Sequence, residues 1–330
     1  MKKLKKILGI GIVTLIILLI IIMFYVKIIL PDVGDSPELK VNLSEKNIER
    51  GKYLANHVML CVDCHSTRDW SLFSGPIVEG TTGKGGETFD QTLGFPGKFI
   101  APNITPYHLK NWTDGEIFRA ITSGVSKDGR ALFSIMPYHN YGMLDKKDIE
   151  AVIAYIRTWK PIENKTETSA PDFPMNFIIN TLPQKPAFTK IPEQTDKIKY
   201  GKYMATAAGC IDCHTKQEQG KFVGKPYAGG FEFKLRDGSI VRSANITPHE
   251  ETGIGSWSAE QFVRRFKIYA DSSYQHIPVS EGSFQTVMPW TMYAGMKEKD
   301  LEAIFYYLQS LPPVNNSVEK FTSKDLLMKD

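Results

Sequence analysis

The feature that most constrains this chain is an internal repeat with a period of about 150 residues. The segment GKYLANHVMLCVDCH, which begins at Gly51, matches GKYMATAAGCIDCH, which begins at Gly201, with one extra residue in the first copy. Four further matches follow in the same order: PNITP at 102–106 with ANITP at 244–248, Trp112 with Trp257, IMPY at 135–138 with VMPW at 287–290, and LDKKDIEAVIAYIRTWKPI from Leu144 with MKEKDLEAIFYYLQSLPPV from Met296. Because the order is kept, the chain is predicted to contain one domain twice.

Each copy is predicted to be mostly helical around a loop-rich middle. Apolar positions at helical spacing predict helices over 45–60 and 196–208, which lead into the cysteine motifs, and closing amphipathic helices over 145–159 and 297–311. The stretch FEFKLRDGSIVR alternates apolar and polar residues around Asp237-Gly238, which predicts a β-hairpin, whereas 75–100 is glycine-rich and less regular. The predicted fold class is therefore all-α, with two tandem domains that carry small β-hairpin insertions.

Residues 7–26 are twenty positions without a charge, which is the length that an α-helix needs to cross a bilayer. A cleaved signal peptide is the alternative, but its apolar region is shorter and ends at a small-residue cleavage site, which is not found here. Four lysines precede the segment, at positions 2, 3, 5 and 6, and Lys27 follows it, so the positive-inside rule keeps the N-terminus in the cytoplasm. Without these five lysines the chain has 35 basic and 36 acidic residues, so no nucleic-acid partner is expected.

These signals predict six segments along the chain. They are a cytoplasmic N-terminus with a transmembrane anchor at 1–30, a juxtamembrane linker at 31–44, a first domain at 45–160, a proline-rich linker at 161–195, a second domain at 196–314, and a polar, disordered tail at 315–330. Apolar residues within the linker predict that it packs on a domain surface.

All four cysteines lie in the two C-x-x-C-H motifs, which are Cys61, Cys64 and His65, and Cys210, Cys213 and His214. A thioredoxin-like redox pair with this spacing would need a βαβ context, and a zinc site would need a fourth ligand beside each motif. Covalent haem fits best, because two cysteines three positions apart reach the two vinyl groups of one porphyrin edge and the next residue, histidine, binds the iron. We expect the other ring nitrogen of each histidine to donate to a backbone carbonyl.

The second axial ligand is predicted from the register of the repeat. Among eleven methionines, only Met136 and Met288 are in phase between the copies, 152 positions apart. A single methionine before proline usually packs in a core, but its repetition downstream of each motif favours an iron ligand. The expected cofactors are two covalently bound haem c groups with four iron ligands, and a thioether opposite histidine favours ferrous iron. The predicted ligands are His65, Met136, His214 and Met288.

Other polar and aromatic positions are weaker candidates. Asn103 and Thr105, like their counterparts Asn245 and Thr247, either hydrogen-bond a haem propionate or form a plain turn with proline. Trp112 and Trp257 either lie in a core or bring an indole N–H to the same place. The remaining histidines have no counterpart in the other copy and are interpreted as surface or loop residues: His57, His108, His139, His249 and His276.

With these motifs the chain resembles the c-type cytochromes. More narrowly, it is similar to the membrane-anchored multihaem cytochrome subunits that accept electrons from periplasmic alcohol, aldehyde, gluconate or nicotinate dehydrogenases. The resemblance covers about 45–315 and rests on both C-x-x-C-H segments, both NITP turns, and the segments ending in MPY and MPW. It implies two tandem cytochrome c domains with thioether attachment at the four cysteines and axial ligation by the four ligands predicted above. Those subunits commonly carry three haem domains and a C-terminal anchor, whereas this sequence has two copies and an N-terminal apolar segment.

The sequence therefore predicts an electron carrier with no catalytic residues, because both axial positions of each iron are filled. It would be a single-pass protein of the cytoplasmic membrane, with haem domains on the periplasmic or extracellular side. Its expected partners are a dehydrogenase subunit or quinol-side donor and, as acceptor, a terminal oxidase or soluble cytochrome. The alternative is a dihaem enzyme, a peroxidase or a sulfur-compound dehydrogenase, which needs an exchangeable axial position. A redox or gas sensor would also need an output domain, and none is visible in the sequence.

Overall fold

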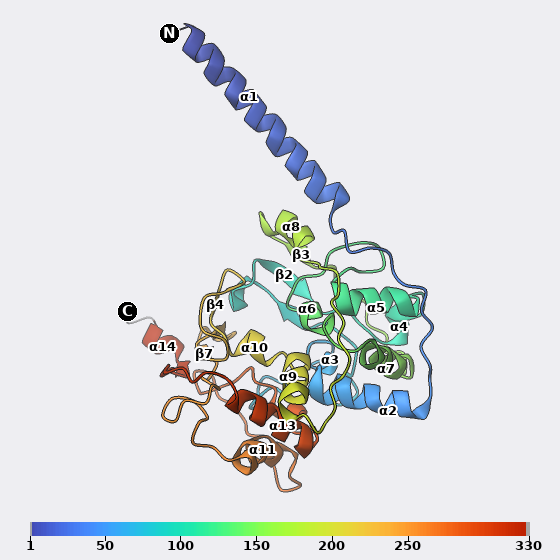
Figure 1. The fold of residues 1–330 in the computed structure, drawn as a ribbon, viewed down its shortest axis with the longest axis vertical. Coiled ribbons are helices and arrows are strands. Elements are labelled where there is room, and N and C mark those ends of the chain that lie inside the picture. The colour runs from blue at the N-terminus through green and yellow to red at the C-terminus, as the bar shows by residue number, and fades with distance from the viewer. Residues whose placement is uncertain (1, 328–330) are drawn as a thin grey trace.

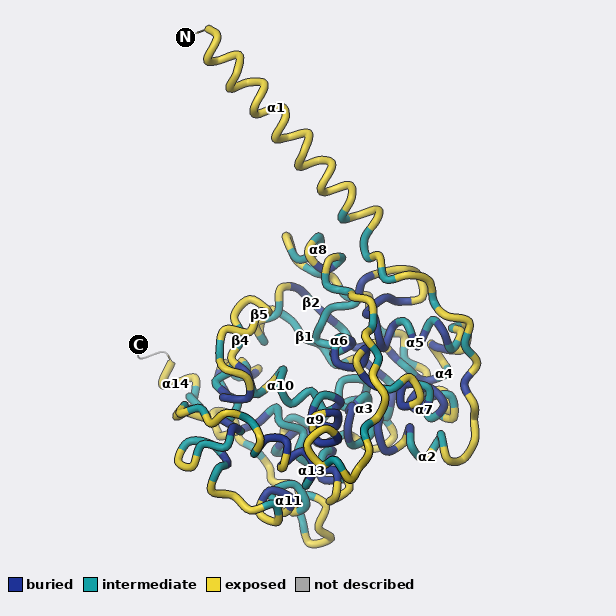
Figure 2. The backbone as a smooth tube through the Cα atoms, viewed as in Figure 1, coloured by how far each residue is buried: buried dark blue, intermediate teal, exposed yellow. Residues whose placement is uncertain are grey.

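In the computed structural model, which describes residues 2–327, a long apolar helix precedes a mostly helical body (Figure 1). Helix α1 spans Lys2–Phe24 and continues as a π-helical turn over Tyr25–Ile29. Its side chains are exposed along its length, and Figure 2 shows the helix standing clear of the body. Lys2–Ile28 is the one stretch of the described residues that is long and apolar enough to cross a membrane, in agreement with the span predicted at 7–26.

The first and last long helices of each half pack against each other. Helix α2 (Glu45–Tyr53), extended by a π-helical turn over Leu54–Val58, packs on α7 (Lys146–Arg157). In the second half α9 (Lys197–Ala207) packs in the same way on α13 (Glu298–Gln309). All four helices coincide with the predicted ones to within three residues.

Glycine sets how closely these helices approach. A β-carbon added at Gly51 would lie 1.8 Å from the carbonyl oxygen of Ala151, and one added at Gly201 would lie 1.9 Å from that of Ala303. No side chain fits at such distances, so the GKY element of the repeat fixes the same helix crossing in both halves. The repeat therefore encodes a packing geometry as well as a motif.

A further helix lies in the middle of each half, α5 (Asp114–Ser123) in the first and α11 (Ala259–Lys267) in the second. Both begin with a capping box, in which the residue before the helix and its third residue exchange hydrogen bonds with each other's backbone. The other helices have four residues each: α3 (Cys61–Cys64), α4 (Pro106–Leu109), α6 (Tyr138–Tyr141), α8 (Met175–Ile178), α10 (Cys210–Cys213), α12 (Trp290–Tyr293) and α14 (Lys324–Leu327).

The strands form three small antiparallel sheets. One contains β1 (Thr88–Phe89), β2 (Gly97–Ile100) and β3 (Ala170–Pro171), and another pairs β4 (Gln217–Glu218) with β5 (Lys221–Phe222). The third contains β6 (Glu232–Lys234), β7 (Ile240–Arg242) and β8 (Phe321–Thr322), with Phe233 opposite Val241. The predicted hairpin around Asp237-Gly238 is thus confirmed as β6–β7.

The prediction of a disordered tail at 315–330 is wrong for its described part, 315–327. Strand β8 pairs with β7, and the Asn316 side chain donates to the carbonyl oxygen of Ala228 over 2.8 Å. The sequence is polar, but its backbone completes the sheet, and sheet pairing depends on backbone groups. Residues 328–330 lie outside the described residues.

The two halves share one core and exchange matched hydrogen bonds. A single cluster of buried side chains includes Leu54 of the first half and Met204 of the second, both without exposed surface. Across the contact, the Tyr53 hydroxyl donates to Asp300 (2.5 Å) and the Tyr203 hydroxyl donates to Asp148 (2.7 Å). Each hydroxyl also accepts a backbone N–H, from residue 297 or 145, over 3.1 Å. The halves are thus related by an approximate two-fold axis.

Candidate functional site

Each C-x-x-C-H motif follows a sharp reversal at the end of the first helix of its half. Leu60 (φ 52°) and Gly209 (φ 63°) adopt the left-handed conformation immediately before Cys61 and Cys210. Glycine takes this conformation without strain, whereas leucine does so at a cost of about 1–3 kcal/mol. The reversal starts a single turn of helix, α3 or α10, that places both cysteines of a motif on one short element.

The two motif histidines make the same hydrogen bond. The Nδ1 atom of His65 lies 2.7 Å from the carbonyl oxygen of Pro102, and that of His214 lies 2.7 Å from the carbonyl oxygen of Ala244. A carbonyl oxygen only accepts, so Nδ1 carries the proton and the lone pair remains on Nε2. Burial lowers the pKa of both imidazoles below the usual 6.5, so they are neutral at neutral pH. Each histidine is therefore fixed in the tautomer that binds a metal through Nε2, and the expected carbonyl partners are found.

The surroundings of the cysteines differ from those of a reactive thiol redox pair. All four are free of disulfide bonds. Burial raises the pKa of the Cys61 and Cys210 thiols to about 12, whereas a reactive thioredoxin-type cysteine titrates near pH ~7. Nor does any group of three His, Cys, Asp or Glu side chains among residues 2–327 form a metal-binding set. The raised pKa of the thiols weighs against the thioredoxin-like alternative.

The two in-phase methionines occupy equivalent positions on the backbone. Met136 and Met288 are partly buried, and the proline that follows each of them caps a single-turn helix, α6 or α12. Met136 packs against the same core cluster as Cys61 and Cys210. The structure thus brings the first methionine and both leading cysteines to the edge of one core.

Three buried polar atoms near these segments fit a bound group with hydrogen-bonding substituents. The Tyr138 hydroxyl, the Thr291 hydroxyl and the Trp159 indole N–H have no hydrogen-bond partner among the described residues. Tyr138 and Thr291 lie two and three positions after the methionines, and Trp159 packs beside Leu60 and Val62 around the first motif. Buried polar groups are normally paired, so these three are available to a bound group, although five other buried polar atoms of the described residues, at other positions, are also unpaired.

The NITP turns are structural rather than ligand-binding. The Oδ1 atom of Asn103 accepts from the backbone N–H and the hydroxyl of Thr105, and its amide donates to the carbonyl oxygens of Ile162 and Asn164. Asn245 makes the matching bonds to Thr247. Asn103, Thr105 and Thr247 have no exposed surface, so their polar groups are already used within the protein. Of the two interpretations left open by the sequence, the plain turn is favoured.

Each half also holds the methionine segment of the other, which sequence reasoning missed. Asp212, between the cysteines of the second motif, accepts from the Asn140 amide (2.5 Å) and lies 3.2 Å from His139 Nε2. In the opposite direction, the hydroxyl of Ser74 donates to the carbonyl oxygen of Met288 (2.6 Å) and accepts from the backbone N–H of Trp290 (2.9 Å). Asp212 matches Asp63 in the first motif, but His139 and Asn140 are replaced by Thr291 and Met292 in the second copy. The repeat therefore gave no signal for these contacts.

A buried arginine shapes the loop that carries Ser74. The Arg68 guanidinium forms an ion pair with Asp63 (2.8 Å), stacks over the Trp70 ring at 4.0 Å and donates to the carbonyl oxygens of Ser74 and Gly75. Its side chain is 5% exposed. The first motif and the loop that reaches the second methionine are therefore one connected unit.

The interpretation of His57 as a surface or loop residue is wrong. This histidine lies in the π-helical turn before the first motif, and its Nδ1 is 3.0 Å from the carbonyl oxygen of Met292 in the second half. Gly295 makes room for the ring, because a β-carbon there would lie 2.1 Å from it. His57 is thus part of the contact between the halves.

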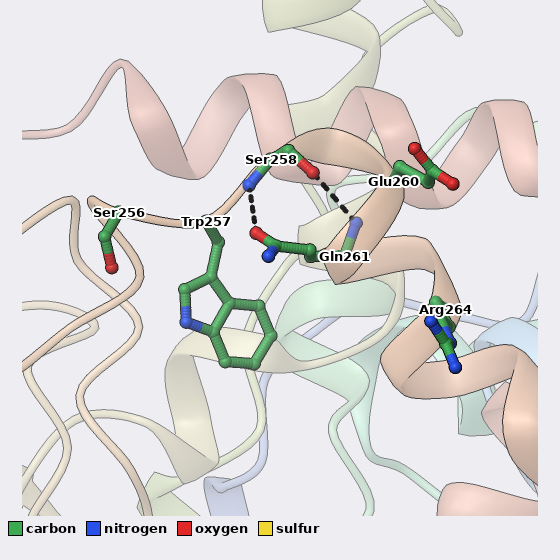
Figure 3. Close-up of a pocket in the computed structure, with 6 residues that line it drawn as sticks. All are labelled: Ser256, Trp257, Ser258, Glu260, Gln261 and Arg264. Carbon is green, nitrogen blue, oxygen red and sulfur yellow. Dashed lines mark hydrogen bonds between the residues drawn. The ribbon is translucent and has the colours of Figure 1, made fainter.

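Trp257 does not belong to the candidate site. It is 36% exposed and lines a surface hollow of about 440 Å³ at the start of α11 (Figure 3). The hydrogen bonds seen there join Ser258 and Gln261 and form the capping box of the helix. Trp112, by contrast, packs against the main core. Trp112 and Trp257 therefore lie in different surroundings, although they match in the repeat.

Comparison with known proteins identifies relatives of the kind that the motifs predict. The chain is 27% identical over 293 residues to the cytochrome c subunit of a quinone-dependent alcohol dehydrogenase from Gluconacetobacter polyoxogenes. The matched region covers 83% of this chain and 58% of the relative. It is 25% identical over 300 residues to the gluconate 2-dehydrogenase cytochrome c subunit of Pantoea cypripedii, and this match covers 86% of the chain and 63% of the relative. A dihaem c-type cytochrome of Cereibacter sphaeroides is 26% identical over 164 residues, which are 47% of this chain and 53% of the relative.

No protein-family model matches the chain. The chain spans about six-tenths of the length of the two dehydrogenase subunits. Its homologues over most of its length are cytochrome c subunits of dehydrogenases, as the sequence resemblance predicts.

Proposed function

We propose that this protein is a membrane-anchored electron carrier that binds two haem c groups, one in each half. Cys61 and Cys64 would hold the first group as thioethers, and Cys210 and Cys213 the second. The observation that carries the proposal is the repeated bond from histidine Nδ1 to a backbone carbonyl, which leaves Nε2 of His65 and His214 free to bind iron. When bound, haem supplies a one-electron iron couple at each site.

Met136 and Met288 would be the second axial ligands. They are in phase in the repeat, and each is followed by a proline that caps a single-turn helix. Contacts from the other half hold both segments, through Asp212 on one side and Ser74 on the other. Such contacts fix the two sites relative to each other, which suits electron transfer between them.

Helix α1 would be a single transmembrane anchor with its N-terminus in the cytoplasm. Its length and apolar composition allow a full crossing, and its basic residues lie mainly before the apolar stretch. The two halves would then lie as tandem cytochrome c domains on the periplasmic or extracellular side. This is the compartment in which the proposed donor, a dehydrogenase subunit, would meet them.

The proposed electron path starts at a dehydrogenase subunit or a quinol-side donor and ends at a terminal oxidase or a soluble cytochrome. Its support is that relatives are named as cytochrome c subunits of alcohol and gluconate dehydrogenases. The polypeptide would supply ligands, burial and orientation, while the electrons reside on iron.

The test is to express the full chain in a host that matures c-type cytochromes and to count haem per chain. We expect two covalently bound groups with low-spin ferric spectra. Met136→Ala and Met288→Ala should each convert one site to a high-spin spectrum. Met143→Ala is the matched control, because this methionine is 41% exposed and has no counterpart in the repeat. Colourless protein, or an unchanged spectrum in both ligand variants, would contradict the proposal. A high-spin resting haem with peroxide turnover would identify an enzyme instead.

A further inference from the structure

The segment between the two halves contains a short element, residues 170–182, that we name the linker foot. Its first residues form β3, which pairs with β2, and the Asp172 carboxylate accepts from the Gln91 amide over 2.7 Å. Further along, Ile179 is buried in a cluster with Phe99 and Ala131. These contacts fix one side of the linker foot to the body.

The other side of the linker foot contacts the end of helix α1, beside which α8 lies in Figure 1. The Lys27 ammonium donates to the carbonyl oxygen of Asn176 over 2.8 Å and lies 4.8 Å from the centroid of the Phe177 ring. The Asn180 amide donates to the carbonyl oxygen of Val26 over 3.1 Å. Val26 and Lys27 belong to the last turn of the candidate span Lys2–Ile28, so the linker foot lies at the depth where that span ends.

The edge of the linker foot that contacts neither the body nor helix α1 is apolar. Phe173 is 80% exposed and meets Phe177 edge-to-face, and Ile178 is 42% exposed. Asp172 is the one ionisable residue in the thirteen positions, and its carboxylate is hydrogen-bonded to Gln91. Aromatic and aliphatic side chains beside a lysine at the end of a hydrophobic span are typical of residues that lie in the membrane interface.

We propose that Phe173 and Ile178 insert into the lipid interface beside helix α1, so that the linker foot sets the orientation of the body on the bilayer. A lipid surface is favoured as the occupant because the exposed edge is continuous with the end of the apolar span, to which it is tied by three contacts. A single helix leaves a body free to swivel, whereas a second point of insertion restricts it. The inference rests on the membrane anchoring in the proposed function and does not depend on haem.

The test measures lipid contact at single sites in the haem-loaded full chain. Phe173→Cys and Ile178→Cys carry an environment-sensitive fluorophore and are reconstituted in phosphatidylcholine vesicles, with or without lipids that bear a quencher near the headgroup. Ile268→Cys is the matched control, because Ile268 is 41% exposed and directly follows α11, at the end of the body far from α1 (Figure 1). Ile16→Cys, within α1, reports on the anchor itself with a quencher placed deep in the acyl chains. The parent chain without an added cysteine gives the background label.

We expect the quencher to lower fluorescence at 173 and 178 by about a factor of two or more, and to leave residue 268 unaffected. Quenching at residue 16 without any at 173 and 178 would overturn the inference and leave the anchor intact. No quenching at residue 16, 173 or 178 would overturn both. Label uptake by the parent chain would show that native cysteines are not bound to haem, which counts against the haem assignment. This background fluorescence is subtracted before the lipid comparison.

Discussion

Replacing Gly201 with alanine should destabilise the protein, although alanine is the better helix former. The added β-carbon would lie 1.9 Å from the carbonyl oxygen of Ala303 and 2.5 Å from its carbonyl carbon, whereas real β-carbons stay beyond 3.0 Å. Helix α9 must therefore move away from α13 by about 1 Å, because the opposing atoms are backbone and cannot rotate aside.

Two opposing free energies decide the size of the effect. Alanine gains about 1 kcal/mol over glycine within a helix. Forcing an extra carbon into a packed contact costs about 1–3 kcal/mol, and the upper end applies where backbone meets backbone. We therefore expect a net loss of about 2 kcal/mol, which corresponds to a fall in Tm of about 4–8 °C for a body of this size.

The assay is thermal unfolding of the full chain in detergent, followed by circular dichroism. Lys202→Ala is the matched control, because it lies next to Gly201 on the same helix and its side chain is exposed. Since α9 runs through Gly209 into Cys210, its displacement should also perturb the absorbance spectrum of the second site. A Gly201→Ala variant that melts at or above the temperature of Lys202→Ala would refute the packing argument.

Three further changes test the contact between the halves. Tyr203→Phe removes the hydroxyl that donates to Asp148, so urea unfolding should show a loss of about 1–3 kcal/mol, whereas the control Tyr306→Phe should be neutral because its ring is 39% exposed. Ser74→Ala leaves the Met288 carbonyl unpaired. With Met288 as the proposed iron ligand, the absorbance band of methionine-bound ferric haem should then disappear on heating at a lower temperature than in wild type, and equal temperatures would contradict the role of Ser74. Burial lowers the pKa of His57, so the folded state binds a proton more weakly than the unfolded chain, and stability should fall as pH drops below about 6.5. His57→Gln should flatten that part of the profile, and an unchanged pH dependence would refute this assignment.

The sequence predicted the helices well because their signals are local. Apolar spacing and proline stops locate α2, α7, α9 and α13, and the Asp237-Gly238 turn locates the β6–β7 hairpin. Helices α5 and α11 were not predicted, although TDGE and SAEQ are capping-box signals that mark their starts.

The contacts between the halves could not be predicted from the sequence, since they join residues that are far apart in the chain. Nothing local distinguishes Ser74 from any other serine of the chain, yet it is fully buried against the Met288 segment. The same holds for the tail, where β8 is ordered by pairing with β7. The histidine Nδ1 bonds were predictable, because iron-binding histidine usually has its other nitrogen fixed.

The crossed tyrosine–aspartate pairs bear on how such a chain could arise. Each half supplies one hydroxyl and one carboxylate to the other, so a half on its own holds every partner that a second copy of itself would need. Identical subunits form two-fold dimers through this kind of self-complementary surface. Joining the genes of a homodimer would then give this body without inventing an interface. The two aspartates of such a joined chain could then acquire different neighbours. Arg50 donates to Asp148 in one half, whereas the equivalent residue of the other half, Tyr200, donates to Asp300.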